Sequence, residues 1–81
     1  MVGQIVCSKA GRDKGSFMVI TELKGENVLV CDGKKRPLEN PKLKNRKHLA
    51  FTNTVLEAKQ FESNRSLRRA INEFCGGKDN F

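Results

Sequence analysis

The chain has 81 residues, enough for one small domain with a modest hydrophobic core. Its 16 Lys and Arg exceed its 9 Asp and Glu, and the net charge of +7 favours a polyanionic partner. No stretch approaches the roughly 18 apolar residues of a membrane helix, and the N-terminal residues lack the pattern of a secretion signal, so we expect a cytoplasmic protein without membrane contact.

Two strands are expected at residues 5–7 and 17–23, because both runs are rich in β-branched or aromatic residues. In the second run Phe17 and Val19 share one face while Met18 and Ile20 share the other, which predicts a curved strand covered on both sides. The loop between the runs combines glycines and cations, namely Lys9, Gly11, Arg12, Lys14 and Gly15. Glycine can adopt positive φ, so this loop is suited to presenting its cations to phosphates.

Residues 24–27 predict a tight hairpin turn, and residues 28–31 predict a third short strand. Asp32 and Gly33 predict a further turn, which three cations follow directly: Lys34, Lys35 and Arg36. The segment 37–41 is bounded by prolines, which cannot donate to a sheet. We therefore expect either an edge strand or an extended connection there.

From residue 38 to residue 47 the side chains are predicted to alternate between the core and solvent. Leu38 and Leu43 are expected to turn inward, while the cations between and beyond them point outward. Residues 48–52 predict another strand, with Leu49 and Phe51 together on the core face. Residues 53–62 fit either an extension of this strand or the start of a helix.

A helix is predicted at residues 63–76. Ser63 and Asn64 are both good N-caps, and the helical period places four apolar side chains on one face: Leu67, Ala70, Ile71 and Phe74. Gly76 and Gly77 are suited to ending the helix. Three arginines, Arg65, Arg68 and Arg69, share the other face and either extend a nucleic-acid surface or are simply solvated. Residues 77–81 are expected to form a frayed tail.

Residues 2–31 resemble the KOW motif of ribosomal proteins and transcription elongation factors. Gly11 stands at the place of the loop glycine of that family, and Gly11 to Gly15 match its Gly-x-x-Lys-Gly pattern. The resemblance implies an SH3-like barrel. We therefore expect a mostly β fold, with a barrel of about five strands at 1–53, a connection at 54–62, and a C-terminal α-helix at 63–76 packed on the barrel.

The chain offers little for catalysis or metal binding. Its cysteines, Cys7, Cys31 and Cys75, form no Cys-x-x-Cys pair and are expected to be reduced. His48 lies among cations with no acidic neighbour, and no nucleophile is paired with a base. We expect no enzyme, no metal and no cofactor.

We expect instead an RNA-binding monomer. The resemblance implies ribosomal RNA as the ligand, as in eukaryotic-type large-subunit ribosomal proteins, and ribosomal or transcription proteins as further partners. The scarcity of aromatic residues favours contacts to the backbone of structured RNA over base stacking. A protein-interaction module on the same barrel is the alternative, and DNA is a third candidate ligand. The expected RNA contacts are Lys9, Arg12, Lys14, Lys34, Lys35, Arg36, Lys42, Lys44, Arg46 and Lys47, with Gly11 and Gly15 shaping the first loop.

Overall fold

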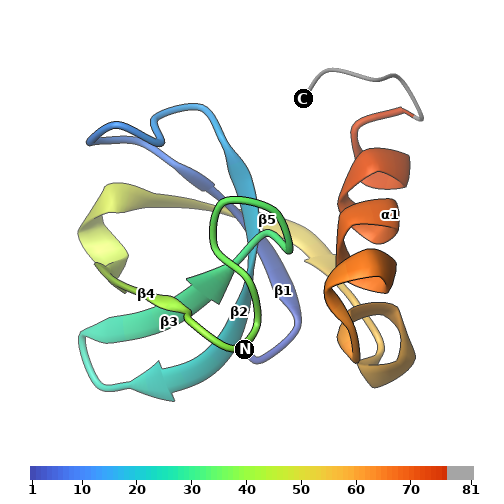
Figure 1. Cartoon of the computed structure of the whole chain (residues 1–81). Helices are drawn as coiled ribbons and strands as arrows, with labels where there is room; N and C mark the ends of the chain where they lie inside the picture. Colours follow the sequence, from blue (N-terminus) through green and yellow to red (C-terminus); the bar gives the residue numbers. More distant parts are fainter. Residues whose placement is uncertain (77–81) are drawn as a thin grey trace.

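The computed structural model describes residues 1–76, so the expected tail at 77–81 lies outside the described residues. Five antiparallel strands form one sheet in the order β4-β3-β2-β1-β5, and a helix follows them (Figure 1). The mostly β fold with a C-terminal helix is thus confirmed. The elements are β1 (Gln4–Ser8), β2 (Phe17–Lys24), β3 (Asn27–Cys31), β4 (Lys42–Asn45), the 3₁₀ helix η1 (Arg46–His48), β5 (Leu49–Val55), the 3₁₀ helix η2 (Ala58–Phe61) and α1 (Asn64–Phe74).

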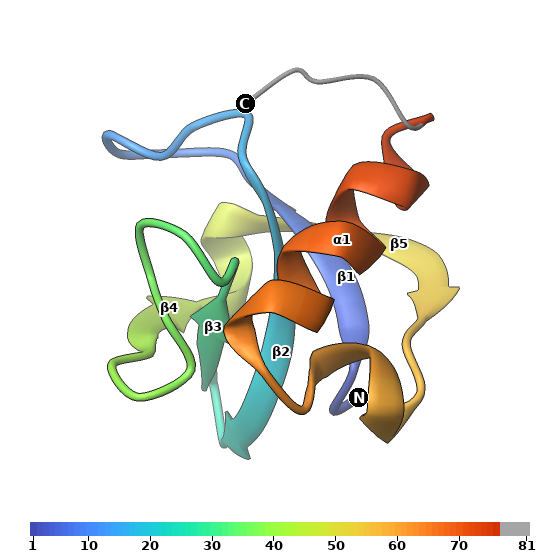
Figure 2. The ribbon, with the colours of Figure 1, turned by 45° about the vertical axis from the view of Figure 1, so that its right-hand side comes forward.

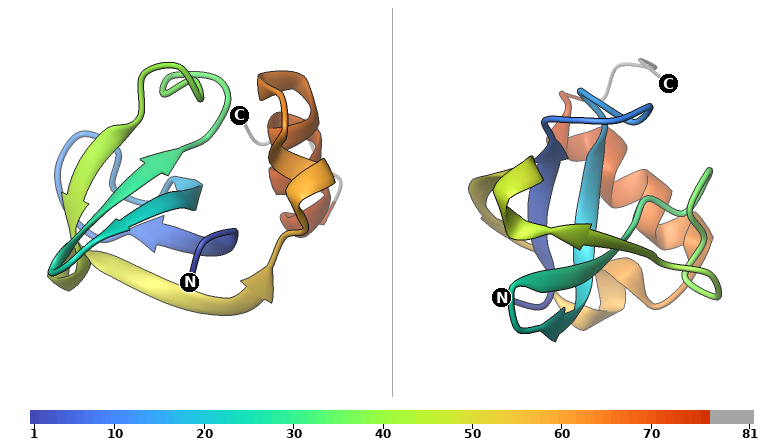
Figure 3. Two further views of the ribbon diagram at one scale, coloured as in Figure 1. Left: turned by 90° about the horizontal axis from the view of Figure 1, so that it is seen from below. Right: turned by 90° about the vertical axis from the view of Figure 1, so that its left-hand side faces the viewer.

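The sheet is strongly curved, and apolar residues pack on both of its faces. Figure 3 shows the strands curling into a barrel-like shape with α1 beside it. Met18 and Ile20 of β2 belong to the core inside the curl, with Val6, Val28, Val30 and Leu49. Val19 faces the opposite way and packs with Ile5, Cys31 and the apolar face of α1. The two-sided apolar pattern predicted for this strand is therefore confirmed.

The helix α1 closes the second core. Ser63 is its N-cap, and the Ser63 hydroxyl accepts a hydrogen bond from the Ser66 backbone N–H at 3.1 Å. Leu67, Ala70 and Ile71 are buried as the helical period predicted. Phe74 meets Phe17 edge to face, with ring centroids 5.2 Å apart. Gly76 follows the helix with a φ of 96°, the conformation expected of the residue that ends it.

The turns agree with the sequence. Lys24 pairs with Asn27 across a tight hairpin turn. At the second turn the Asp32 carboxylate accepts backbone hydrogen bonds from Lys34 and Arg36 at 2.8 and 2.9 Å. The boundary predicted at residue 53 is too early, because β5 continues to Val55. Residues 53–62, where the sequence fits either a strand or a helix, contain the 3₁₀ helix η2 beyond the end of β5.

The segment from 37 to 45 corrects the sequence prediction. Residues 37–41 form a connection, and the strand β4 begins only at Lys42. Lys44 pairs with Val28 and therefore turns toward the interior, while Leu43 pairs with Leu29 on the outside and is 54% exposed. Lys42 pairs with Val30 and lies on the same inner side as Lys44. The expected orientations of Leu43, Lys42 and Lys44 are thus wrong. The Lys44 ammonium can occupy this interior position because it pairs there with the Asp13 carboxylate.

The core face predicted for Phe51 is confirmed, but its side chain is only partly covered. Phe51 pairs with Val6 and so lies on the core side of the sheet, as does Leu49, which pairs with Ser8. Leu49 is buried, but Phe51 is 41% exposed. The strand β5 lies at the edge of the sheet and pairs with β1 alone, so its outer part lacks cover.

Candidate nucleic-acid interface

The first basic loop (residues 9–15) has a fixed backbone. The Gly15 N–H donates to the Ser8 carbonyl at 2.8 Å, and the Lys9 N–H donates to the His48 carbonyl at 2.7 Å. Gly11 has a φ of 84°, which residues with a side chain rarely adopt. The positive φ foreseen for this glycine is thus present in the loop.

Asp13 anchors the loop from within. Its carboxylate accepts hydrogen bonds from the Ser8 hydroxyl at 2.8 Å, from the Lys44 ammonium at 3.0 Å and from the Lys42 ammonium at 3.3 Å. Ser8 belongs to β1 and both lysines belong to β4, two strands that are not neighbours in the sheet. The network therefore joins opposite sides of the curled sheet at one end. Burial acts to raise the pKa of Asp13, but the bonds from Lys44, Ser8 and Lys42 outweigh it and lower the pKa to about 2.

The loop cations, unlike Asp13, face solvent. Lys9, Arg12 and Lys14 are all exposed, and no ion pair engages them among residues 1–76. Three positive charges thus project from a backbone that hydrogen bonds hold in place. This arrangement can donate to phosphate oxygens, with Arg12 forked and the lysines as point charges.

The second group of expected contacts is divided by the structure. Lys34, Lys35 and Lys47 are exposed, whereas Arg36 and Lys42 are half-buried. The Arg46 Nε donates to the Gly25 carbonyl at 2.8 Å. The Lys44 side chain is only 9% exposed, and its ammonium also donates to the Ala10 carbonyl at 3.0 Å. Lys44 therefore holds the first basic loop in place and is not presented to a ligand.

The structure adds a basic groove (Asp32, Lys34, Arg65, Arg68, Arg69, Ile71 and Asn72) between the start of the 32–41 connection and α1. Its volume is about 430 Å³. Figure 2 shows the 32–41 connection beside α1 and the first basic loop as a separate projection of the sheet. The helical period of the sequence indicates that the three arginines share one face of α1, but nothing in the sequence indicates that Lys34 lines the same groove.

Asp13 was likewise not foreseen as an anchor. Its signal in the sequence is that it is the lone acid among the loop cations. No group of His, Cys, Asp and Glu within residues 1–76 could hold a metal ion. In the same part of the chain no helix is long and apolar enough to cross a membrane.

In comparisons with known proteins, no family model matches the chain and no curated protein matches it either.

Proposed function

We propose that this protein binds structured RNA electrostatically, with the first basic loop as its main contact. The observation that supports the proposal is that the acid of that loop is bonded within the protein while its cations face solvent. Asp13 is held by Ser8, Lys42 and Lys44, while Lys9, Arg12 and Lys14 are exposed and free of acidic partners in the described chain. A fixed backbone lowers the ordering cost of binding, so cations presented in this way bind phosphates more strongly than cations on a mobile loop.

The resemblance to the KOW family supports the proposal. The loop glycine of that motif corresponds to Gly11, and its φ of 84° gives a physical reason for glycine at this position. By the same resemblance we propose an SH3-like barrel that binds ribosomal RNA, in the cytoplasm. DNA shares the phosphate chemistry, and a matched DNA duplex therefore belongs in the binding experiment.

The test is a titration of a labelled, structured RNA with wild type and with the double variant Arg12→Gln, Lys14→Gln. We expect the double variant to bind several-fold more weakly at unchanged thermal stability, because both side chains are exposed. The matched control is Lys24→Gln, Lys59→Gln, which removes the same charge from exposed positions outside the first basic loop. Equal affinity of the two double variants would remove this loop from the interface.

A second candidate function is a protein-interaction module. It is favoured by the exposed apolar side chains of the edge strand β5, Phe51 at 41% and Val55 at 45%. An edge strand with free backbone groups can accept a strand from another chain. Phe51→Ser would then abolish partner binding and leave RNA affinity unchanged, whereas the RNA proposal gives no role to Phe51.

A further inference from the structure

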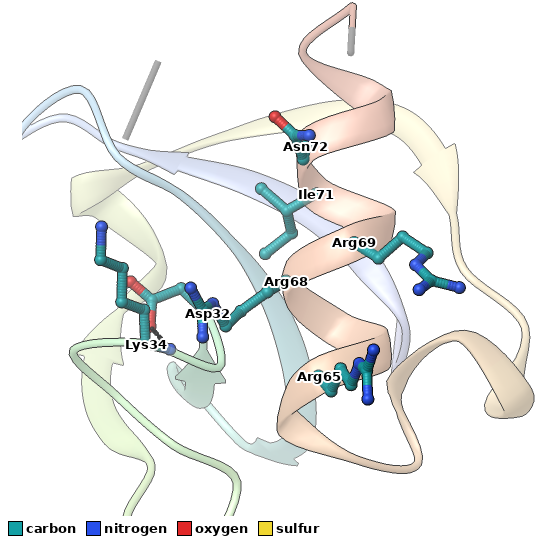
Figure 4. A pocket seen from close by; sticks show the side chains of 7 residues that line it. All are labelled: Asp32, Lys34, Arg65, Arg68, Arg69, Ile71 and Asn72. Carbon is teal, nitrogen blue, oxygen red and sulfur yellow. Dashed lines mark hydrogen bonds between the residues drawn. The ribbon is translucent and has the colours of Figure 1, made fainter. Parts of the chain in front are cut away.

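The basic groove is built by a close approach of the 32–41 connection to α1. A Cβ added at Gly33 would lie 2.6 Å from the Asn64 carbonyl oxygen and 2.9 Å from the Arg68 Cγ. Only glycine therefore allows the connection to come this near the helix. The approach places Lys34 and Asp32 opposite Arg68, which reaches from α1 toward them (Figure 4).

The groove combines cations with two hydrogen-bond acceptors. Lys34, Arg65, Arg68 and Arg69 supply the positive charge. Ile71 also borders the groove but is only 2% exposed, so it adds almost no surface. Asp32 contributes a carboxylate, of which Oδ1 already accepts two backbone N–H groups. Asn72 lines the same groove, and its Oδ1 is buried without a hydrogen-bond partner among the described residues.

The unpartnered Asn72 oxygen lowers the stability of the folded state, because a buried acceptor without a donor loses its hydrogen bonds to water and gains none in return. A half-turn of the amide would present the NH₂ group in its place, so the side chain can offer either an acceptor or a donor. The Oδ1 atom has almost no accessible surface, so it pairs with a ligand only after the Asn72 side chain turns into the groove. A ligand with both donors and acceptors then suits either end of the amide. Nucleobases carry both along their edges.

Resting on the proposed RNA binding, we propose that the basic groove receives one unpaired nucleotide of the RNA. The arginines and Lys34 hold its flanking phosphates, the guanidinium plane of Arg68 contacts the base face, and the Asn72 amide and the Asp32 carboxylate meet the base edge. Arginine planes stack on exposed bases, so this site does not need the Trp and Tyr that the chain lacks. The volume of about 430 Å³ lies within the range of sites for single small ligands.

Other occupants fit less well. A free phosphate would meet the cations but would leave the acceptors of Asp32 and Asn72 without a donor from a base. An intact duplex presents a wide, shallow surface whose bases cannot enter a groove. Because the Asp32 carboxylate only accepts hydrogen bonds, bases with an exocyclic amino group (A, C and G) suit the groove better than uracil.

The experiment compares two RNA hairpins that differ only by one bulged nucleotide. Wild type is expected to bind the bulged hairpin about tenfold more tightly than the fully paired one, the order of one stacked and hydrogen-bonded base. Among the four bulge bases, uridine is expected to bind most weakly. A 2-aminopurine in the bulge gives a second signal, because its fluorescence changes when the base leaves the helix and enters the groove.

Two groove variants separate the base contacts from charge. Asn72→Ala removes the amide without creating a buried polar group, and Ala favours a helix more than Asn. It is expected to retain or raise the thermal midpoint while it loses most of the bulge preference. Arg68→Lys keeps the charge but not the plane and is expected to lose part of the preference. Lys59→Gln removes an exposed charge outside the groove and is the control, which is expected to keep the full preference for the bulged hairpin.

The outcomes distinguish this proposal from the proposed function. If wild type binds both hairpins equally and the double variant Arg12→Gln, Lys14→Gln weakens both, RNA binding stands and the groove proposal is overturned. If wild type binds neither hairpin, both are overturned. If Asn72→Ala keeps the full preference and the full 2-aminopurine signal, the bulged base lies elsewhere. Displacement of the bulged hairpin by inorganic phosphate or an acidic peptide at equal charge would also overturn the nucleotide assignment.

Discussion

Asp13 is the residue on which the geometry of the first basic loop depends. Its side chain is 18% exposed and lies between the ammonium groups of Lys42 and Lys44. Without an acid at this position, Lys44 would be a buried cation with only a carbonyl partner, which is strongly unfavourable. The acid therefore reduces the positive charge of the loop by one while it ties the loop to β1 and β4.

Asp13 makes stability depend on pH in the acid range. Its pKa is about 2 in the folded chain against a usual value of 3.8, so the folded state favours the ionised form. This contribution, about 2 kcal/mol, is complete above pH 5 and is lost as the pH falls from 4 to 2. In urea unfolding Asp13→Asn is expected to be less stable than wild type by at least that amount at pH 7, because it also leaves Lys44 without its acidic partner. The difference should shrink toward pH 2. A difference that stays constant over this range would assign the loss to packing.

Gly11 is expected to be required for its backbone conformation. A Cβ here would meet its nearest atom at 3.5 Å, which is ordinary contact, so the strain comes from the φ of 84° alone. Gly11→Val is expected to cost about 1–3 kcal/mol, and Gly11→Asn less, because Asn adopts this region more readily. Thermal unfolding of the two variants measures the difference. Equal melting temperatures for Val and Asn would mean that the loop relaxes to ordinary φ at little cost.

At the scale of the elements, α1 is expected to be part of the core. Leu67 is fully buried and lies in one cluster with Ile5, Val19 and Cys31 of the sheet. Leu67→Ala is expected to destabilise the protein by about 2–5 kcal/mol, a large part of the stability of a domain of this size. Glu73→Ala, on the exposed face, is the control and should change little. If Leu67→Ala melted like wild type in calorimetry, α1 would be separable from the sheet.

Elements with strong local patterns could be predicted from the sequence. The strand β2 has apolar residues on both faces, and α1 has a helical period with a Ser63 cap, so local chemistry determined both. The strand β4 has no such pattern, because two of its four residues are lysines. The strand pairs with β3, and its two lysines bond Asp13, about thirty residues earlier in the chain. A contact of that kind leaves no local trace.

The candidate site shows the same limit. The exposed cations of the first basic loop follow from its glycines and charges, so the sequence could indicate them. Lys44 has the same chemical character in the sequence as its neighbours, and only the fold shows that it is buried. The basic groove depends on the approach of Gly33 to Asn64 and Arg68 across distant parts of the chain. The sequence predicts the composition of such a surface but not its shape.

For the whole molecule, the buried and exposed lysines of one segment should contribute differently to the salt dependence of RNA affinity. Lys44 is held inside by Asp13, while Lys47 is exposed, yet both carry one charge. Each phosphate contact releases condensed counterions, so log affinity falls with log salt by about 0.9 per contact on a duplex. With four to six contacts from the exposed cations, wild type should show a slope of roughly −3 to −5.

The last prediction compares two neighbouring charge removals in that salt titration. Lys47→Gln is expected to flatten the slope by about 0.9 at unchanged stability. Lys44→Gln should leave the slope near that of wild type while it lowers the melting temperature, because it removes a partner of Asp13 rather than a phosphate contact. Equal flattening by both variants would mean that Lys44 leaves Asp13 to bind RNA. A flat response in wild type, with tight binding to a protein, would favour the interaction module through β5 instead.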